Sequence, residues 1–326
     1  MKKLLFCILT LLLISCQKDE PKTVKLKAPV FGTFYNIQYY SEKGIDYQQQ
    51  FDSIFTVINK SLSTYIPESN ISKLNRNESV ELDEHFDKVY NASKKIYKET
   101  KGVFDPTIGN VVNAWDFGPE RNKFVTDSAT IDKLMTSVGF DKVVRLNERF
   151  IKPDDVYFDF NAIAKGYGID VIVEFLQNQG IKNYLVDIGG DLRTGGTNIE
   201  KASNWTIGID NPNFDGSQSY SKVITLSNKA MATSGTYRKF KTDEEGNRYA
   251  HIIDTKTGYP TKTNVLSVSV IAPTCMLADG YATAFQAMGI ERVREFLKTH
   301  PELQVYFIYS DNSNIWQTLS LNGFPD

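Results

Sequence analysis

Apolar residues recur along the chain with two different spacings, which together predict a mixture of helices and strands. Residues Phe51, Ile54, Phe55, Ile58 and Leu62 repeat every three or four positions, so an amphipathic helix is expected from about residue 45. Similar spacing, ended in several places by glycine, predicts further helices at 86–101, 128–139, 166–179, 276–288 and 293–299. Short apolar or alternating runs predict strands at 33–40, 156–160, 184–188, 205–209, 223–226, 249–253, 266–271, 305–309 and 315–319.

The order of these elements favours an α+β fold. Strands and helices do not alternate regularly, and the second half of the chain contains hairpin-like pairs of strands. We therefore expect largely antiparallel sheets with packed helices. No internal repeat or low-complexity segment interrupts residues 30–326, so we expect a single compact catalytic domain there.

The first sixteen residues have the pattern of a secretion signal. Two lysines precede an apolar run over 4–14, which is too short to span a bilayer. The run ends in LISC at 13–16, which resembles the lipobox of bacterial lipoproteins. The resemblance implies removal of a signal peptide at 1–15, a lipid on Cys16 and a polar tether over 16–29. The alternative is a plain signal peptide with an incidental cysteine.

Composition excludes several classes of protein and site. The chain has 37 basic and 39 acidic residues and no long basic run, so we expect no nucleic-acid partner. Its three cysteines are Cys7, Cys16 and Cys275, and it has three histidines. These residues are too few and too scattered for a disulfide framework or for a metal site built on cysteine or histidine.

A turn at 100–109 reads TKGVFDPTIG and combines two glycines with an Asp-Pro pair. Such a turn has an unusual backbone path, and turns of this kind often present main-chain groups to a ligand. The alternative is a purely structural turn in which Asp105 caps Thr107 or Ile108. Composition does not decide between the two.

Two further motifs suit close contact with a ligand. The sequence DFNAIAKGYG at 159–168 runs from a predicted strand into a predicted helix start. Helix N-termini attract phosphates, and Lys165 adds a positive charge there. The spacing matches neither the Walker loop nor the dinucleotide-binding fingerprint. The sequence VDIGGDL at 186–192 ends a strand in paired glycines, where a ligand or another backbone segment can approach closely.

The last two motifs contain side chains suited to catalysis and metal binding. His251 ends a predicted strand and is worth considering because histidine is scarce here, although a lone histidine is more often structural. Asp279 and Thr283 lie four residues apart in a predicted helix, so their oxygens share one face and suit Mg²⁺. The alternative, favoured by spacing alone, is that Thr283 bonds to its own helix and Asp279 is a buried cap partner.

Together these motifs resemble the FAD:protein FMN transferase family, also described as the thiamine-biosynthesis lipoprotein ApbE family. The resemblance covers essentially all of the chain after the tether. The one departure is Phe31, where many members have Met, and both side chains can pack against a flavin or adenine ring. The matching stretches, in the family's order, are FGT at 31–33, STY at 63–65 with Ser69, GVFDPTIG at 102–109, AKGY at 164–167, VDIGG at 186–190, TSG at 233–235, HIID at 251–254 with TG at 257–258, and ADGYAT at 278–283.

The resemblance implies a reaction and a set of site residues. Members transfer the FMN half of FAD onto a Thr or Ser hydroxyl of a partner protein and release AMP. The implied Mg²⁺ ligands are the Ala164 carbonyl oxygen and the side chains of Asp279 and Thr283. His251 is our candidate base for the acceptor hydroxyl, with Asp254 to orient it. The implied FAD contacts are Phe31, Tyr65, Val103, Phe104, Asp105, Asn161, Tyr167 and the backbone of Ile253, and Lys165 lies beside them but outside the set.

Two other functions stay open at this point. One is an FAD pyrophosphatase, which gives FMN and AMP because water replaces the acceptor, and the other is a flavin-binding lipoprotein without catalysis. The Asp279 and Thr283 pair favours catalysis, because passive binding needs no metal over the phosphates. For the transferase we expect the acceptor to be a separate protein, a redox subunit that faces the periplasm. We expect the enzyme to be lipid-anchored to a bacterial membrane, facing the periplasm or the cell surface.

Overall fold

The centre of the fold is an eight-stranded sheet, seen in the computed structural model, which describes residues 22–120, 127–146, 149–237, 240–242 and 248–326. The strand order is β1-β2-β5-β6-β9-β12-β13-β14, and every neighbouring pair is antiparallel. This confirms the expected α+β class. The strands of this sheet are β1 (Lys22–Val30), β2 (Thr33–Ser41), β5 (Tyr184–Ile188), β6 (Asp191–Gly195), β9 (Ala230–Gly235), β12 (Val265–Ala272), β13 (Gln304–Ser310) and β14 (Trp316–Leu321).

Three short antiparallel pairs lie outside the main sheet. Strands β7 and β8 correspond to the strands predicted at 205–209 and 223–226, and they pair with each other. The six strands are β3 (Val144–Leu146) with β4 (Arg149–Ile151), β7 (Trp205–Asp210) with β8 (Tyr220–Leu226), and β10 (Phe240–Thr242) with β11 (Arg248–Ala250).

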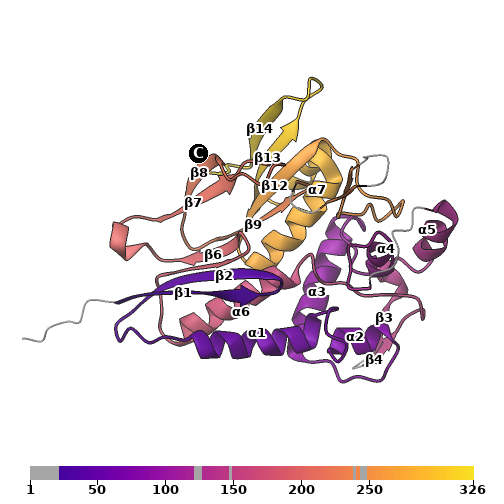
Figure 1. The fold of residues 1–326 in the computed structure, drawn as a ribbon, viewed down its shortest axis with the longest axis horizontal. Helices are drawn as coiled ribbons and strands as arrows, with labels where there is room; N and C mark the ends of the chain where they lie inside the picture. Colours follow the sequence, from indigo (N-terminus) through magenta and orange to yellow (C-terminus); the bar gives the residue numbers. More distant parts are fainter. Residues whose placement is uncertain (1–21, 121–126, 147–148, 238–239, 243–247) are drawn as a thin grey trace, which may run out of the picture.

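Helices cover the sheet and bury one face each. Helix α6 packs on β5 and β6, α7 packs on β9 and β12, and the two helices contact each other. Figure 1 shows α1, α2 and α3 on one side of the molecule and β12, β13 and β14 on the other, with α6 and α7 between them. The helices are α1 (Gln48–Leu62), α2 (Asn70–Asn75), α3 (Glu84–Glu99), α4 (Gly109–Ala114), α5 (Ser128–Met135), α6 (Ala164–Asn178) and α7 (Cys275–Leu297), with single 3₁₀ turns at Phe140–Lys142 and Ile199–Lys201.

The periodic segments of the sequence fold as predicted. In α1 the residues of the predicted apolar face, Phe51, Phe55, Ile58 and Leu62, are buried. The strand predicted at 184–188 matches β5. The two helices predicted at 276–288 and 293–299 are joined in α7 across a kink at Gly289, whose φ of 73° interrupts the helical backbone. No helix in the described part of the chain is long and apolar enough to cross a membrane.

The tether predicted over 16–29 is wrong from residue 22 onward. Residues 22–30 form β1, the edge strand of the main sheet, paired along its length with β2. Val24, Leu26, Ala28 and Val30 alternate with exposed residues, so the strand buries one face by a period of two. Lysines between the apolar positions masked this signal, and charged residues are common on edge strands. The signal peptide at 1–15 and Cys16 lie outside the described residues.

Two predicted strands also differ from the structure. Residues 156–160 are buried alternately, but within the described residues their one strand-like pairing is an isolated parallel bridge between Tyr157 and Ile108. The strand predicted at 249–253 ends at Ala250 as β11, and Ile253 makes a single bridge to Pro260. Strand β9 was not predicted, because AMATSG at 230–235 consists mainly of small residues with little β-branched pattern. Strand β6, with the sequence DLRTG, was not predicted either.

Candidate active site

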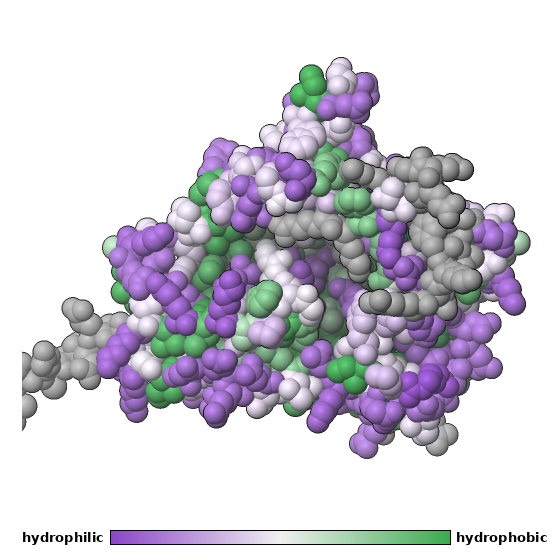
Figure 2. All heavy atoms as spheres, in the orientation of Figure 1, coloured by the Kyte–Doolittle hydropathy of each residue, from purple (hydrophilic) through white to green (hydrophobic). Residues whose placement is uncertain are grey.

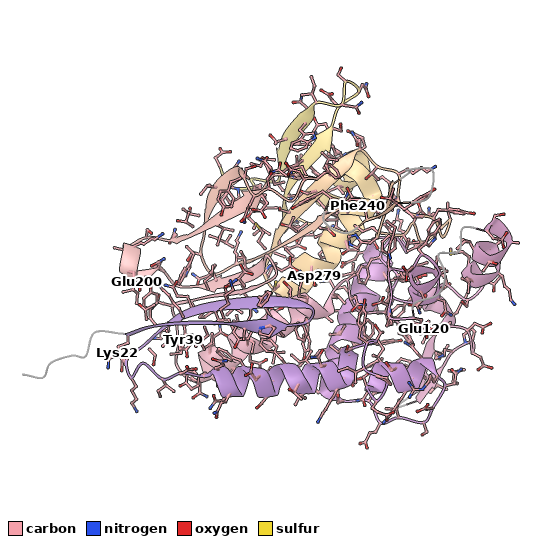
Figure 3. The ribbon with its side chains drawn as sticks, viewed as in Figure 1. Lys22, Tyr39, Glu120, Glu200, Phe240 and Asp279 are labelled. Atoms are coloured by element: carbon pink, nitrogen blue, oxygen red, sulfur yellow. The ribbon has the colours of Figure 1, made fainter. Side chains whose placement is uncertain are left out.

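A cavity of about 420 Å³ opens where the N-terminal end of α6, the middle of α7 and the loop at 103–108 meet. The volume falls within the range of small-molecule sites, roughly 300–1,000 Å³. Figure 2 shows the surface hollowed near the centre of the view, in the region where Figure 3 labels Asp279. The predicted site residues that line the cavity are Val103, Phe104, Asp105, Asn161, His251, Ile253, Asp279 and Thr283.

Asp279 joins the two helices at the base of the cavity. Its Oδ2 accepts a hydrogen bond of 2.9 Å from the backbone N–H of Gly166, in the first turn of α6. The helices can approach this closely only because residue 166 is glycine: a Cβ there would lie 2.3 Å from the Cys275 carbonyl oxygen. Ala164 is the first residue of α6, two positions before Gly166, and it is not among the described residues that line the cavity.

The structural alternative raised for Asp279 and Thr283 holds for Asp279 but not for Thr283. Asp279 does serve as a buried cap partner, for the neighbouring helix α6. Thr283 lines the cavity one turn along α7, and in the described part of the chain its hydroxyl forms no hydrogen bond with its own helix. Asp279 and Thr283 with the Ala164 carbonyl are hard oxygen donors of the kind that Mg²⁺ takes. Among the described residues no three acidic, histidine or cysteine side chains are grouped so that they could hold a metal ion.

Burial, and then the nearby Asp191 carboxylate, raise the pKa of Asp279 to about 7, although Lys165 and the Gly166 N–H oppose the shift. An aspartate in an unfolded chain titrates near 4. Between about pH 4 and pH 7, Asp279 of the folded protein holds a proton that the unfolded chain has lost. The free energy of unfolding therefore falls as the pH rises through this range.

We expect Asp279→Asn to raise the melting temperature of the metal-free protein at pH 8. The asparagine oxygen still accepts the Gly166 N–H bond, and the residue no longer ionises. The difference between the variant and the original chain is expected to shrink as the pH falls from about 7 to 4. Thermal unfolding in EDTA at several pH values measures this, and equal melting temperatures at pH 8 would contradict the raised pKa.

Lys165 and Asp191 form an ion pair in the cavity wall. Lys165 Nζ lies 2.8 Å from Asp191 Oδ2, and the Asp191 side chain is 2% exposed against 28% for Lys165. The other carboxylate oxygen, Asp191 Oδ1, accepts the Thr233 N–H of β9 at 3.1 Å. Burial disfavours the charged ammonium, but the Asp191 and Asp279 carboxylates outweigh it and raise the pKa of Lys165. The lysine is therefore charged at physiological pH.

The loop at 103–108 lines the opposite side of the cavity, and Asp105 holds it in shape. Asp105 Oδ1 accepts hydrogen bonds from Thr107 N at 2.9 Å and Thr107 Oγ1 at 2.7 Å, and Oδ2 accepts from Phe140 N at 3.2 Å. Burial raises the pKa of Asp105 against these hydrogen bonds. The structural alternative, with Asp105 capping Thr107, is thus present, and the loop also faces the cavity.

His251 reaches the cavity from a segment that aromatic contacts hold in place. The rings of His251 and Phe117 pack in a T-shaped arrangement, with 6.2 Å between their centroids. Beside them, Trp115 stacks on Tyr249 and donates a 2.7 Å hydrogen bond from Nε1 to the Gly258 carbonyl. The sequence did not point to Trp115, because its role depends on a segment more than a hundred residues away.

Asp254, predicted to orient His251, takes part in a local turn, and its orienting role stays a prediction. Its Oδ1 accepts hydrogen bonds from Lys256 N at 2.8 Å and Thr257 N at 3.1 Å, as in an Asx turn. The carboxylate thus shapes the turn after Ile253. Asp254 is not among the described residues that line the cavity.

Three predicted flavin contacts lie away from the described cavity wall. Phe31 packs edge-on against Phe55 at 5.3 Å and fills the space left by Gly168 of α6. Tyr65 is 55% exposed and borders a second depression of about 450 Å³. Tyr167 is buried, with its hydroxyl 2.8 Å from His85 Nδ1 on α3. Their roles as flavin contacts stay predictions.

The cavity is strongly acidic. The charged side chains of its described lining are five aspartates and one lysine: Asp105, Asp159, Asp191, Asp210, Asp279 and Lys165. An excess of acidic side chains disfavours a diphosphate, and a divalent cation offsets this repulsion. A Mg²⁺ ion beside Asp279 and Thr283 fits this role. Sequence reasoning missed Asp191, although it follows the paired glycines at 189–190 directly.

Known proteins resemble this chain over most of its length. The family model described as the ApbE family matches residues 31–307. A protein of Haemophilus influenzae named FAD:protein FMN transferase is 36% identical over 98% of this chain and 97% of its own. One of the same name from Vibrio cholerae is 36% identical over 86% of each chain.

Solved structures agree with the sequence relatives. The flavin transferase ApbE from Vibrio cholerae superposes with a TM-score of 0.83 at 33% identity, over 92% of this chain and 97% of its own. The apo form of the Pseudomonas stutzeri flavinyl transferase ApbE gives 0.82 at 26% identity, over 92% and 95%. With the family match over 31–307, these findings establish that the chain belongs to the ApbE family.

Proposed function

We propose that this protein is an FAD:protein FMN transferase, which moves the FMN moiety of FAD onto a Thr or Ser hydroxyl of a partner protein and releases AMP. The observation that carries the proposal is the meeting of His251, Asp279 and Thr283 in one cavity, in a chain whose relatives bear this name. A base and a set of oxygen donors for a metal are what transfer from a diphosphate to a hydroxyl requires.

The steps of the proposed reaction can be assigned to residues at the cavity. The acceptor oxygen forms a bond to the FMN phosphorus, and the bond from that phosphorus to the bridging oxygen breaks. The bridging oxygen leaves on AMP with the electron pair, and the hydroxyl proton passes to His251. Asp279, Thr283 and the Ala164 carbonyl would hold Mg²⁺, which offsets the negative charge of the diphosphate. The walls formed by the 103–108 loop and by 251–253 orient FAD and exclude water.

An assay with an acceptor protein distinguishes a transferase from a pyrophosphatase. Incubation with FAD, Mg²⁺ and a candidate redox subunit is expected to give AMP and a fluorescent acceptor protein in equal amounts. AMP with free FMN and no labelled acceptor would indicate a pyrophosphatase. FAD binding without AMP would indicate a flavin-binding protein without catalysis.

A lipid anchor on Cys16 would hold the enzyme at a bacterial membrane, where its acceptor faces the periplasm. We expect Cys16→Ser to move the protein to the soluble fraction with its transferase activity intact. Each buried CH₂ of an acyl chain contributes about 0.8 kcal/mol, so several chains give stable anchoring and their loss releases the protein. Fractionation of cells that express each form measures this, and a variant that remains in the membrane would exclude the anchor.

A further inference from the structure

We propose that Lys165 is a substrate-binding residue whose ammonium contacts the diphosphate of FAD, and that Asp191 is the residue that positions it. This inference rests on the proposed function, because it assigns a role at the same site. Lys165 is the only lysine or arginine in the described lining of the cavity. The described lining also contains five aspartates, so among the described residues Lys165 is the cationic side chain available to a diphosphate.

The position of Lys165 places its charge beside the predicted metal ligands. It is the second residue of α6 and follows Ala164, and Asp279 accepts a hydrogen bond from the next residue, Gly166. The N-terminal end of a helix also favours a negative group through its dipole. Helix, lysine and metal ligands therefore converge on one place.

Asp191 fixes the ammonium within the cavity. Its carboxylate is almost completely buried and bridges Lys165 Nζ on one oxygen and the β9 backbone on the other. A long, flexible lysine side chain is thereby held in one direction, which reduces the entropy lost when a ligand binds. The Lys165 side chain lines the cavity with 28% of its surface exposed, and an ammonium has three hydrogen-bond donors.

The opposing explanation is that Lys165 only neutralises Asp191. A buried carboxylate without a partner is costly, so a lysine is expected beside it even when no ligand binds. The two explanations differ when both charges are removed together. Lys165→Met with Asp191→Asn keeps the net charge of the cavity, and it removes the ammonium without leaving an unpaired buried carboxylate.

The experiment measures the affinities of FAD, ADP and riboflavin by calorimetry, with Mg²⁺ and without an acceptor protein. Loss of a charge-assisted hydrogen bond is expected to weaken FAD and ADP about 10- to 100-fold in the double variant, with riboflavin changed less than about twofold. Lys165→Arg keeps the charge and is expected to retain most of the affinity. Lys152→Met is the matched control, because Lys152 is also partly buried and bonded, to Asn77 Oδ1 and the Val156 carbonyl, but lies outside the cavity wall.

Wild-type affinity for FAD in the double variant would overturn the proposal and leave Lys165 as a neutralising residue. An equal loss for riboflavin and FAD would also overturn it, because the defect would then be general. Failure of the proposed function shows separately, as a wild-type protein that binds FAD but labels no acceptor. The lysine contact is tested by binding alone and does not depend on that result.

Discussion

Replacement of Asp279 by alanine is expected to lower FMN transfer at least about 1,000-fold at saturating FAD. A bound metal supplies several kcal/mol of transition-state stabilisation in phosphoryl transfer, and about 1.4 kcal/mol corresponds to a factor of ten. The flavin contacts predicted on the loop at 103–105 do not include Asp279, so we expect binding of riboflavin to change little. Rates of AMP release, with flavin fluorescence for binding, measure the two effects separately.

Thr283 and Asp83 provide the controls for this prediction. Thr283→Val removes the second side-chain oxygen of the proposed site and is expected to act in the same direction, whereas Thr283→Ser keeps it. Asp83 caps α3 by accepting a 2.9 Å bond from Phe86 N, so Asp83→Ala removes a capping carboxylate outside the cavity. A normal rate in Asp279→Ala at limiting Mg²⁺, or no effect of EDTA on the native enzyme, would refute the metal site.

Replacement of His251 by alanine is expected to cut the single-turnover transfer rate by a factor of about 10²–10⁴, the usual contribution of a general base. Histidine is the side chain most often used to accept the proton of a reacting hydroxyl. FAD affinity is expected to change little, because the loss is of proton transfer in the transition state.

The glutamine variant separates catalysis from structure. His251→Gln keeps a hydrogen-bonding group of similar size, so it restores activity if the imidazole only donates a bond to a phosphate or a neighbouring segment. A nearly active glutamine variant would therefore remove His251 from the mechanism. His300→Gln is a suitable control, because His300 stacks on Phe296 at 3.9 Å at the end of α7.

The local sequence pattern was sufficient to predict which residues face inward where a single helix or strand contains the whole pattern. The apolar spacing of 51–62 gives the buried face of α1. The interval of four residues between Asp279 and Thr283 places both on the cavity side of α7. In each case the period of a helix or strand reports which face is buried, and that information is contained within a few residues.

Local pattern failed where pairing with a distant segment decides the structure. Residues 22–30 look like a polar tether until β2 pairs with them, and 156–160 look like a strand although the described sheet leaves them almost unpaired. Asp254 Oδ1 accepts hydrogen bonds from the backbone N–H groups of Lys256 and Thr257, and the orienting role of Asp254 stays a prediction.

The sequence by itself determined the α+β class, the residues of the helix faces and the family to which the motifs point. Only the tertiary structure decided that β1 extends the sheet, that Gly166 brings α6 against Asp279, and that Asp191 holds Lys165 in the cavity. The physical reason is that the partner of a buried charge or an edge strand is chosen by the packing of the whole chain. Residues 165, 191 and 279 meet only after three elements have folded together.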